Sequence, residues 1–210
     1  MFNPAPFAVA EPEEADRLLA QARLGILTTN GPQGLFATHL PFIFDPTARR
    51  LRGHMARANP HRSLVAEETE ALVVFQGPQA YVSPNWYPSK ALDGRQVPTW
   101  NYEAVHVRGM LTWYDDPDLL RANVRALSDR FEAGRPQPWS IADAPDDYVT
   151  ALLRGIVGVD VAVEQVTAKR KLSQNKGEAD RVGVIVGLEA AGDPGAADVA
   201  ALMRTLEQST

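Results

Sequence analysis

The amino-acid sequence contains no cysteine. This absence excludes disulfide bonds, thiolate metal centres and cysteine nucleophiles, and it is typical of proteins in a reducing compartment. The sequence also lacks a run of about 18 apolar residues, and its start has no basic segment followed by an apolar core. It therefore predicts no membrane span and no secretion signal, and we expect a cytoplasmic protein.

Signatures of common nucleotide and hydrolase sites are missing as well. The sequence has no G-x-G-x-x-G, no G-x-x-x-x-G-K-[ST] and no G-x-S-x-G motif, so the usual dinucleotide, P-loop and hydrolase sites are not predicted. Its 4 histidines lack the spacing of a metal site, and we expect no bound metal. The formal net charge of -5 argues against a broadly basic surface for nucleic acid.

Short β-strand patterns dominate what the sequence does contain. With 45% hydrophobic residues, a chain of 210 residues can form one well-buried domain. Strand patterns occupy residues 24–29, 35–44, 51–55, 71–75, 80–83, 99–114 and 157–163, and helix patterns occupy residues 13–23, 59–68, 117–134, 146–153 and the chain from residue 178 on. Strands interrupted by helices favour a closed or split β-barrel, in a mainly β fold with peripheral helices (α+β).

A loop rich in aromatic residues lies between two of the predicted strands. Residues 79–109 contain Trp86, Tyr87, Trp100 and Tyr102, separated by several prolines. An aromatic loop between short strands is suited to binding a flat ligand. The same side chains could instead fill a dimer interface, where aromatic residues are enriched.

A second candidate feature is the basic segment at residues 53–62. Asn59 and Pro60 are typical of a helix start, where unpaired amides attract anions, and His54, Arg57, His61 and Arg62 could add charge. The alternative is that Asn59 only caps a helix with solvated basic residues. A phosphate anchor together with flat stacking surfaces would suit a mononucleotide such as a flavin.

Four motifs carry a resemblance to a known family. GHMARANPH, YVSPNWY, VPTWNYEAVHVRG and KRKLSQNKGEADR, in this order, are similar to the PaiB-type FMN-binding negative transcriptional regulators. These proteins are a branch of the flavin-binding split-barrel proteins. The resemblance covers residues 1–188 and implies an antiparallel six-stranded split barrel of the FMN-binding type, a homodimer, and FMN near the subunit interface. Residues 189–210 would form a C-terminal helical tail of the same domain.

The resemblance also implies which residues bind FMN. In the family, the motif GHMARANPH at the basic segment implies a phosphate site. The second predicted strand, residues 35–44, implies contacts to the flavin ring or ribityl chain. The later motifs add residues from the aromatic loop and from the KLSQN stretch, whose subunit of origin stays open. The implied cofactor residues are Thr38, His39, Leu40, His54, Arg57, Asn59, Trp100, Asn101, Tyr102, Lys171, Ser173 and Gln174. The alternative for Lys169, Arg170 and Lys171 is a solvated strand end.

Three function classes remain open from the sequence. The resemblance implies an FMN-binding negative regulator of transcription, although neither the charge nor a helix-turn-helix motif supports direct DNA binding. An FMN-dependent oxidoreductase acting on a small molecule is the second class, and no second substrate is identified. The third class is a dimeric interaction module without a cofactor.

Overall fold

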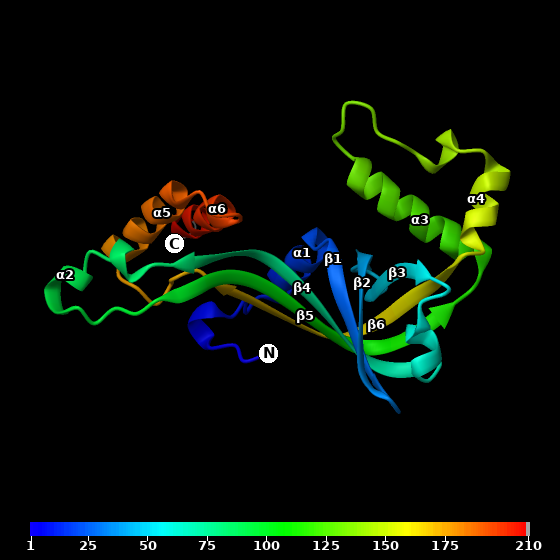
Figure 1. Ribbon diagram of the computed structural model, residues 1–210, viewed down its shortest axis with the longest axis horizontal. Helices are drawn as coiled ribbons and strands as arrows, with labels where there is room; N and C mark the ends of the chain where they lie inside the picture. The colour runs from blue at the N-terminus through cyan, green and yellow to red at the C-terminus, as the bar shows by residue number, and fades with distance from the viewer. Residues whose placement is uncertain (209–210) are drawn as a thin grey trace. The chain divides into compact units, whose positions relative to one another are not determined.

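The computed structural model describes residues 1–208. Figure 1 shows the order of its elements along the chain. The strands are β1 Leu24–Gly31, β2 Gly34–Asp45, β3 Arg50–Ala56, β4 Glu68–Val82, β5 Thr99–Tyr114 and β6 Ile156–Lys171. The helices are α1 Pro12–Gln21, α2 Lys90–Asp93, α3 Pro117–Glu132, α4 Asp146–Leu153, α5 Glu178–Ala191 and α6 Ala196–Gln208. Short 3₁₀ turns are η1 Ala5–Phe7, η2 Pro60–Leu64, η3 Pro84–Trp86 and η4 Ile141–Asp143.

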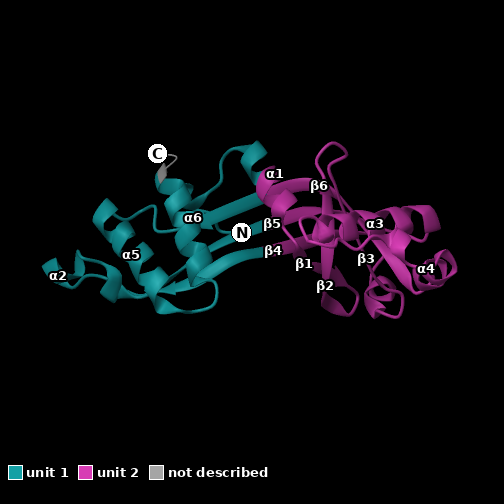
Figure 2. Cartoon of the chain, turned by 90° about the horizontal axis from the view of Figure 1, so that it is seen from above, with its two compact units in different colours: residues 1–15, 76–105, 167–210 teal, residues 16–75, 106–166 magenta. Residues whose placement is uncertain are grey.

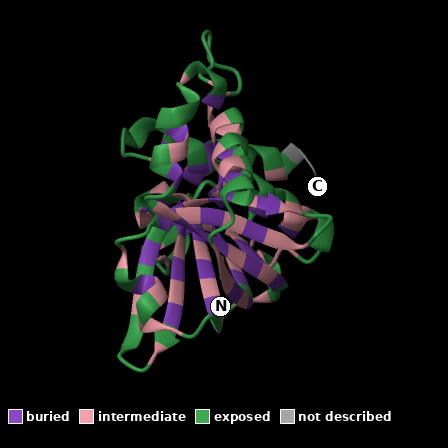
Figure 3. Cartoon of the chain, turned by 90° about the vertical axis from the view of Figure 1, so that its right-hand side faces the viewer, coloured by how far each residue is buried: buried purple, intermediate pink, exposed green. Residues whose placement is uncertain are grey.

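The strands close into a barrel in the order β1-β2-β3-β6-β5-β4. The pairs β1–β2, β1–β4, β2–β3 and β3–β6 are antiparallel. Buried and less buried residues alternate along the strands (Figure 3), and in β3 every second residue is buried. This alternation follows from the two-residue period of a strand, which sends successive side chains to opposite faces. The predicted six-stranded antiparallel split barrel with peripheral helices is confirmed.

The described chain divides into two compact units (Figure 2). Unit 1 contains residues 1–15, 76–105 and the chain from residue 167 on, and unit 2 contains residues 16–75 and 106–166. The strands β4, β5 and β6 contribute residues to both units. The expected division into residues 1–188 and a helical tail stays a prediction, and its boundary falls inside α5.

Unit 2 contains the barrel interior and the two helices α3 and α4. Phe42 and Phe75 meet edge to face inside the barrel, with ring centroids 5.9 Å apart. A smaller cluster lies where α3 meets α4, and it contains the buried residues Leu120, Ile141, Val149 and Leu153. Hydrophobic burial on both faces of this part of the sheet fixes α3 against the barrel.

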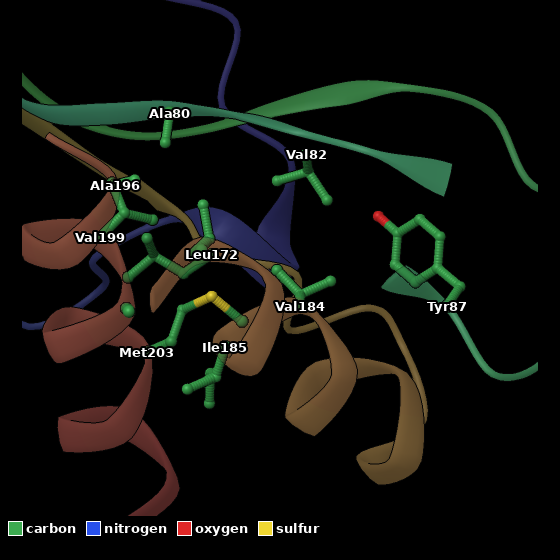
Figure 4. Packing of buried hydrophobic residues seen from close by; sticks show 11 residues of the cluster. Ala80, Val82, Tyr87, Leu172, Val184, Ile185, Ala196, Val199 and Met203 are labelled. Carbon is green, nitrogen blue, oxygen red and sulfur yellow. The ribbon is translucent and has the colours of Figure 1, made fainter. Parts of the chain in front are cut away.

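Unit 1 has a core of its own. Ala80 and Val82 of β4 pack against Val184 of α5 and Met203 of α6, as Figure 4 shows. In α5 the glycines allow close contact: a Cβ at Gly187 would lie 2.3 Å from the ring of Trp86. The aromatic loop is therefore anchored by its first tryptophan against α5.

Two predicted elements differ from the structure. The two strands expected over residues 71–75 and 80–83 form one continuous strand, β4, which ends at Val82. The helix expected over residues 59–68 is only the short 3₁₀ turn η2. Asn59 does cap this turn, because its Oδ1 accepts a hydrogen bond from the amide of His61 at 3.0 Å. The chain is extended again at Val65, and so short a segment has too few hydrogen bonds to propagate an α-helix.

Gly158 provides a test of the packing on the outside of the barrel. It lies opposite His54 in the β3–β6 pair, and a Cβ at this position would lie 2.2 Å from the ring of Tyr114. We expect Gly158→Ala to lower the free energy of unfolding by about 1–3 kcal/mol, because the ring must move. Urea unfolding followed by circular dichroism measures the change.

The matched control is Gly177→Ala, since nothing lies within 4 Å of a Cβ built at Gly177. This variant should stay within about 0.5 kcal/mol of the parent. Equal stability of the two variants would contradict the packing of Tyr114 on Gly158.

Candidate functional site

One face of the sheet in unit 1 combines aromatic rings with lysines. Trp100 and Tyr102 are two residues apart in β5, and Lys169 and Lys171 are two apart in β6, so each pair shares a face. Lys169 Nζ lies 5.3 Å from the Tyr102 ring centroid. Tyr81 of β4 meets Trp100 edge to face at 6.4 Å. We call Tyr81, Trp100, Tyr102, Lys169 and Lys171 the lysine–aromatic face.

The aromatic pair of this face is open to solvent. Tyr81 is 44% exposed and Trp100 is 52% exposed. Two exposed rings in contact form a contiguous apolar patch, and such patches often mark binding sites. The pair is therefore a flat apolar surface that a ring system could cover.

The lysines of this face are charged groups without carboxylate partners. Lys169 is only 6% exposed, and its Nζ donates a hydrogen bond to the carbonyl oxygen of Phe2 at 3.2 Å. Lys171 Nζ donates to Thr99 Oγ1 and to the carbonyl oxygen of Trp100, both at 2.5 Å. Within residues 1–208, neither lysine forms an ion pair. The Lys169 ammonium also lies over the rings of Phe2 and Phe7, which attract a cation. An anion at this face would therefore meet two ammonium groups that have no carboxylate partner.

The pKa of Lys171 reflects the same environment. Burial lowers the pKa of its ammonium, and the neighbouring positive charges of Lys169 and Lys176 lower it further. Arg170 points to the opposite face, where it binds Glu14 and Glu103 at 2.7 Å each. Within the described chain, Glu14 and Glu103 are thus paired with Arg170, and neither forms an ion pair with Lys169 or Lys171.

The KLSQN stretch forms a tight turn that is fixed by hydrogen bonds. Asn101 is fully buried, and its Nδ2 donates to Ser173 Oγ at 3.0 Å. Gln174 Nε2 donates to the carbonyl oxygen of Arg170 at 2.6 Å, and its Oε1 accepts from the amide of Leu172 at 2.7 Å. Ser173 has a φ of 66°, a left-handed conformation that this network holds in place. Asn101, Ser173 and Gln174 therefore shape the turn that follows Lys171.

In unit 2, a buried polar network surrounds His61. The ring is fully buried, and its two nitrogens lie 2.8 Å from Thr29 Oγ1 and 2.8 Å from Thr38 Oγ1. Asn59 Nδ2 donates to Thr38 Oγ1 at 3.3 Å. Burial lowers the pKa of His61 and thus favours the neutral ring. This network fixes the turn η2 to the barrel. Both ring nitrogens of His61 contact threonines of the barrel, so neither is available to a ligand outside the barrel.

An internal carboxylate lies among the basic residues of the predicted phosphate site. Asp115 Oδ1 lies 2.7 Å from Arg57, and its Oδ2 lies 2.6 Å from Arg62. The hydrogen bond from Arg62, together with the one from Arg57, lowers the pKa of Asp115. Arg57 also donates to the carbonyl oxygens of Arg154 and Ile156. The guanidinium groups at this position are thus already bound to protein oxygens.

The remaining predicted residues are spread over unit 2. His54 Nδ1 lies 2.9 Å from Asn123 Oδ1 on α3. Leu40 is 2% exposed in the barrel core, whereas His39 is exposed on β2. The structure therefore brings Thr38 and Asn59 into contact. Among the described residues, His54 and Arg57 have no partner in common, because His54 binds Asn123 and Arg57 binds Asp115. The role of these residues in FMN binding stays a prediction.

Sequence reasoning missed two members of the lysine–aromatic face, Tyr81 and Lys169. Reading the run 169–171 as a solvated strand end was wrong for Lys169, which is buried. The available signal was the strand period: in KRK, the first and third residues share one face and the arginine lies on the other. Among the described residues, we find neither a cluster suited to a metal ion nor a helix suited to crossing a membrane.

Comparison with known proteins defines the class of this protein. Residues 1–165 match the family model described as "Putative FMN-binding domain". Among solved structures, the FAD and heme binding protein from Mycobacterium smegmatis has a TM-score of 0.57 at 17% identity, covering 89% of this chain and 80% of that one. A flavocytochrome from Azotobacter vinelandii has a TM-score of 0.56 at 14% identity, covering 83% and 74%. Both likenesses concern the fold, and together with the family match they define a flavin-binding split-barrel protein.

Relatives in sequence identify the family. The Bacillus subtilis protein called protease synthase and sporulation protein PAI 2 is 33% identical over 205 residues, covering 97% of this chain and 96% of the relative. An uncharacterised protein from Emericella nidulans is 31% identical over 242 residues, covering 97% and 96%. The chain belongs to the PaiB-type family of FMN-binding domains. FMN is the cofactor that this family membership assigns to it.

The buried His61 makes stability depend on pH. Because its pKa is lowered in the folded state, the unfolded chain binds the proton first as pH falls. The stabilisation is complete above the pKa of an unfolded histidine, about 6.5, and is lost below it. We expect the free energy of unfolding in urea to fall between about pH 7.5 and about pH 5.5, and His61→Gln to reduce this fall.

His106 contributes in the same direction, since burial lowers its pKa as well. The double variant with His61→Gln and His106→Gln should therefore lose more of the pH dependence than either single variant. An unchanged pH dependence in the double variant would rule out this origin.

Proposed function

We propose that the lysine–aromatic face holds FMN and that the protein is a negative transcriptional regulator of the PaiB type, acting directly on DNA or indirectly. The observation that carries the FMN site is the pair Lys169 and Lys171, which have no carboxylate partner beside the exposed rings of Tyr81 and Trp100. The regulatory role rests on the resemblance of the motifs to regulators of this type.

The chemistry of this face fits FMN. Its phosphate is an anion, and ammonium donors form strong charge-assisted hydrogen bonds with phosphate oxygens. Its isoalloxazine ring is flat and would stack on exposed aromatic side chains. In this proposal Lys169 and Lys171 hold the phosphate, while Tyr81 and Trp100 contact the ring. When bound, FMN supplies a ring that accepts and releases electrons.

The residues of unit 2 belong to the proposal as further contacts. Thr38, His39, Leu40, His54, Arg57 and Asn59 are implied by the resemblance to FMN-binding relatives. A homodimer, in which FMN lies near the subunit interface, is part of the same proposal. The exposed apolar residues Val182 and Val186 of α5 support it, because neighbouring exposed valines favour association. Light scattering of the purified protein measures the mass.

The FMN site is tested by substitution of Lys171. We expect Lys171→Gln to raise the Kd for FMN about 10- to 100-fold, because a charge-assisted hydrogen bond to phosphate is lost. Quenching of flavin fluorescence during titration measures the Kd. The matched control is Lys90→Gln in the same unit, which removes an equal charge from a lysine whose Nζ binds Asn85 Oδ1. This control should bind FMN like the parent.

Arg57→Gln in the same titration tests the other predicted phosphate contact. A large loss for Arg57→Gln with none for Lys171→Gln would move the phosphate to the basic segment of unit 2. Failure of the parent protein to bind FMN at all would favour the cofactor-free interaction module instead.

The regulatory role is tested with nucleic acid. We expect a direct regulator to enrich specific sequences from a random double-stranded DNA pool at physiological salt, with enrichment that changes when FMN is added. Sequencing of the bound fraction measures the enrichment. Lack of enrichment in both conditions would eliminate direct DNA binding. A parallel assay follows the absorbance of NADPH at about 340 nm over minutes. Oxidation of NADPH by the FMN-loaded protein would instead favour the oxidoreductase.

A further inference from the structure

A second candidate site is a cavity in unit 2 that the FMN proposal does not use. Its volume is about 290 Å³, at the lower end of the range of about 300–1,000 Å³ that is typical of small-molecule sites. The cavity lies between α3 and outward-facing residues of β2, β3, β5 and β6. None of its lining residues belongs to the lysine–aromatic face or to the residues implied to bind FMN.

The walls of the cavity are mainly apolar. Leu119, Ala122 and Ala126 lie on one stripe of α3, since residues three and four apart share a helix face. Ile43 of β2 and the ring of Tyr114 form the opposite wall. The two alanines leave the space open, because larger side chains on this stripe would pack against the sheet. Leu119 is 54% exposed, so a ligand has access from solvent.

Asn123 places a buried amide in the same cavity. It is 5% exposed, and its Oδ1 lies 2.9 Å from His54 Nδ1. This hydrogen bond directs the carbonyl oxygen toward His54 and fixes the amide. No described residue accepts a hydrogen bond from its Nδ2. This amide nitrogen is therefore a free donor at the cavity, and an acceptor atom of a ligand could bind to it.

Arg52 adds a positive charge with unused donors. Its Nε donates to Asp160 Oδ2 at 3.2 Å. Within residues 1–208, no oxygen accepts a hydrogen bond from its two terminal nitrogens. Those nitrogens have the geometry that binds a carboxylate with two hydrogen bonds. The side chain is 42% exposed, which leaves it reachable at the mouth of the cavity.

The carboxylates that line the cavity are already engaged. Asp160 binds Arg50 at 2.7 Å in addition to Arg52. Asp45 Oδ1 accepts hydrogen bonds from the amides of Thr47 and Ala48, and Asp45 lies opposite Arg50 in the β2–β3 pair. Asp160 thus has two arginine partners, and Asp45 is bound by backbone amides. The terminal nitrogens of Arg52 and Nδ2 of Asn123 have no acceptor among the described residues.

We infer that this cavity binds a small carboxylate with an apolar, flat or branched body. The carboxylate accepts hydrogen bonds from Arg52 and Asn123, and the apolar body lies against Tyr114, Leu119 and the two alanines. The ligand binds independently of an FMN on the lysine–aromatic face, because the cavity shares no residue with that face.

Benzoate is the probe that tests this site. Isothermal titration calorimetry on the full protein, with and without FMN, should give saturable binding at one site per chain. Arg52→Gln should weaken benzoate binding about tenfold or more, because a charge-assisted contact is lost. Ala126→Leu should abolish it by filling the cavity, and leucine is a good helix former at this exposed position, so the fold is retained. Circular dichroism confirms folding of each variant.

The matched control is Arg125→Gln on α3. Arg125 is exposed and does not line the cavity, so this variant removes an equal charge and should bind benzoate like the parent. Equal losses for the two arginine variants would overturn the inference, since they would indicate general surface electrostatics. Benzylamine binding as tightly as benzoate, competition between benzoate and FMN, or full binding by Ala126→Leu would each overturn it as well.

Discussion

The two-residue period of the strands is the constraint on which this structure depends. Each long strand places apolar side chains in a core on one face and polar or charged side chains on the opposite face. In β6 this period separates Arg170, which is neutralised by Glu14 and Glu103, from Lys169 and Lys171, which are not neutralised. A shift of one residue in register would exchange the two sets of side chains. The candidate cofactor face therefore exists only because the register of β6 is fixed by its neighbours.

The local charge of the candidate site differs in sign from that of the whole chain. The formal net charge is -5, yet Lys169, Lys171 and Lys176 gather near the end of β6. Burial lowers the pKa of Lys171, and the charges of Lys169 and Lys176 lower it further. Nearby charges decide the binding of a small anion, since salt largely screens charges that lie farther away than about 10 Å. An acidic protein can therefore carry an anion site, although it is poorly suited to a long polyanion.

Much of the fold could be predicted from the sequence, because it depends on local periodicity. The alternation over residues 157–163 predicted part of β6, and the caps and apolar spacing predicted α3 and α4. The motifs predicted the family. The length of η2 could not be predicted, because it depends on His61 entering the barrel between Thr29 and Thr38. These contacts join residues 32 and 23 positions apart, which no local pattern records.

Asp115 gives the basic segment of unit 2 a property that its sequence does not suggest. Its carboxylate is tethered to the same chain and lies between Arg57 and Arg62. A tethered group competes at an effective concentration of about millimolar or more, because it cannot diffuse away. Any soluble anion that approaches these arginines must first displace this internal competitor. Asp115 thus acts as an internal inhibitor of anion binding at this position. The apparent affinity of a ligand there is set by the difference between two free energies: that of the ligand binding to Arg57 and Arg62, and that of Asp115 binding to them.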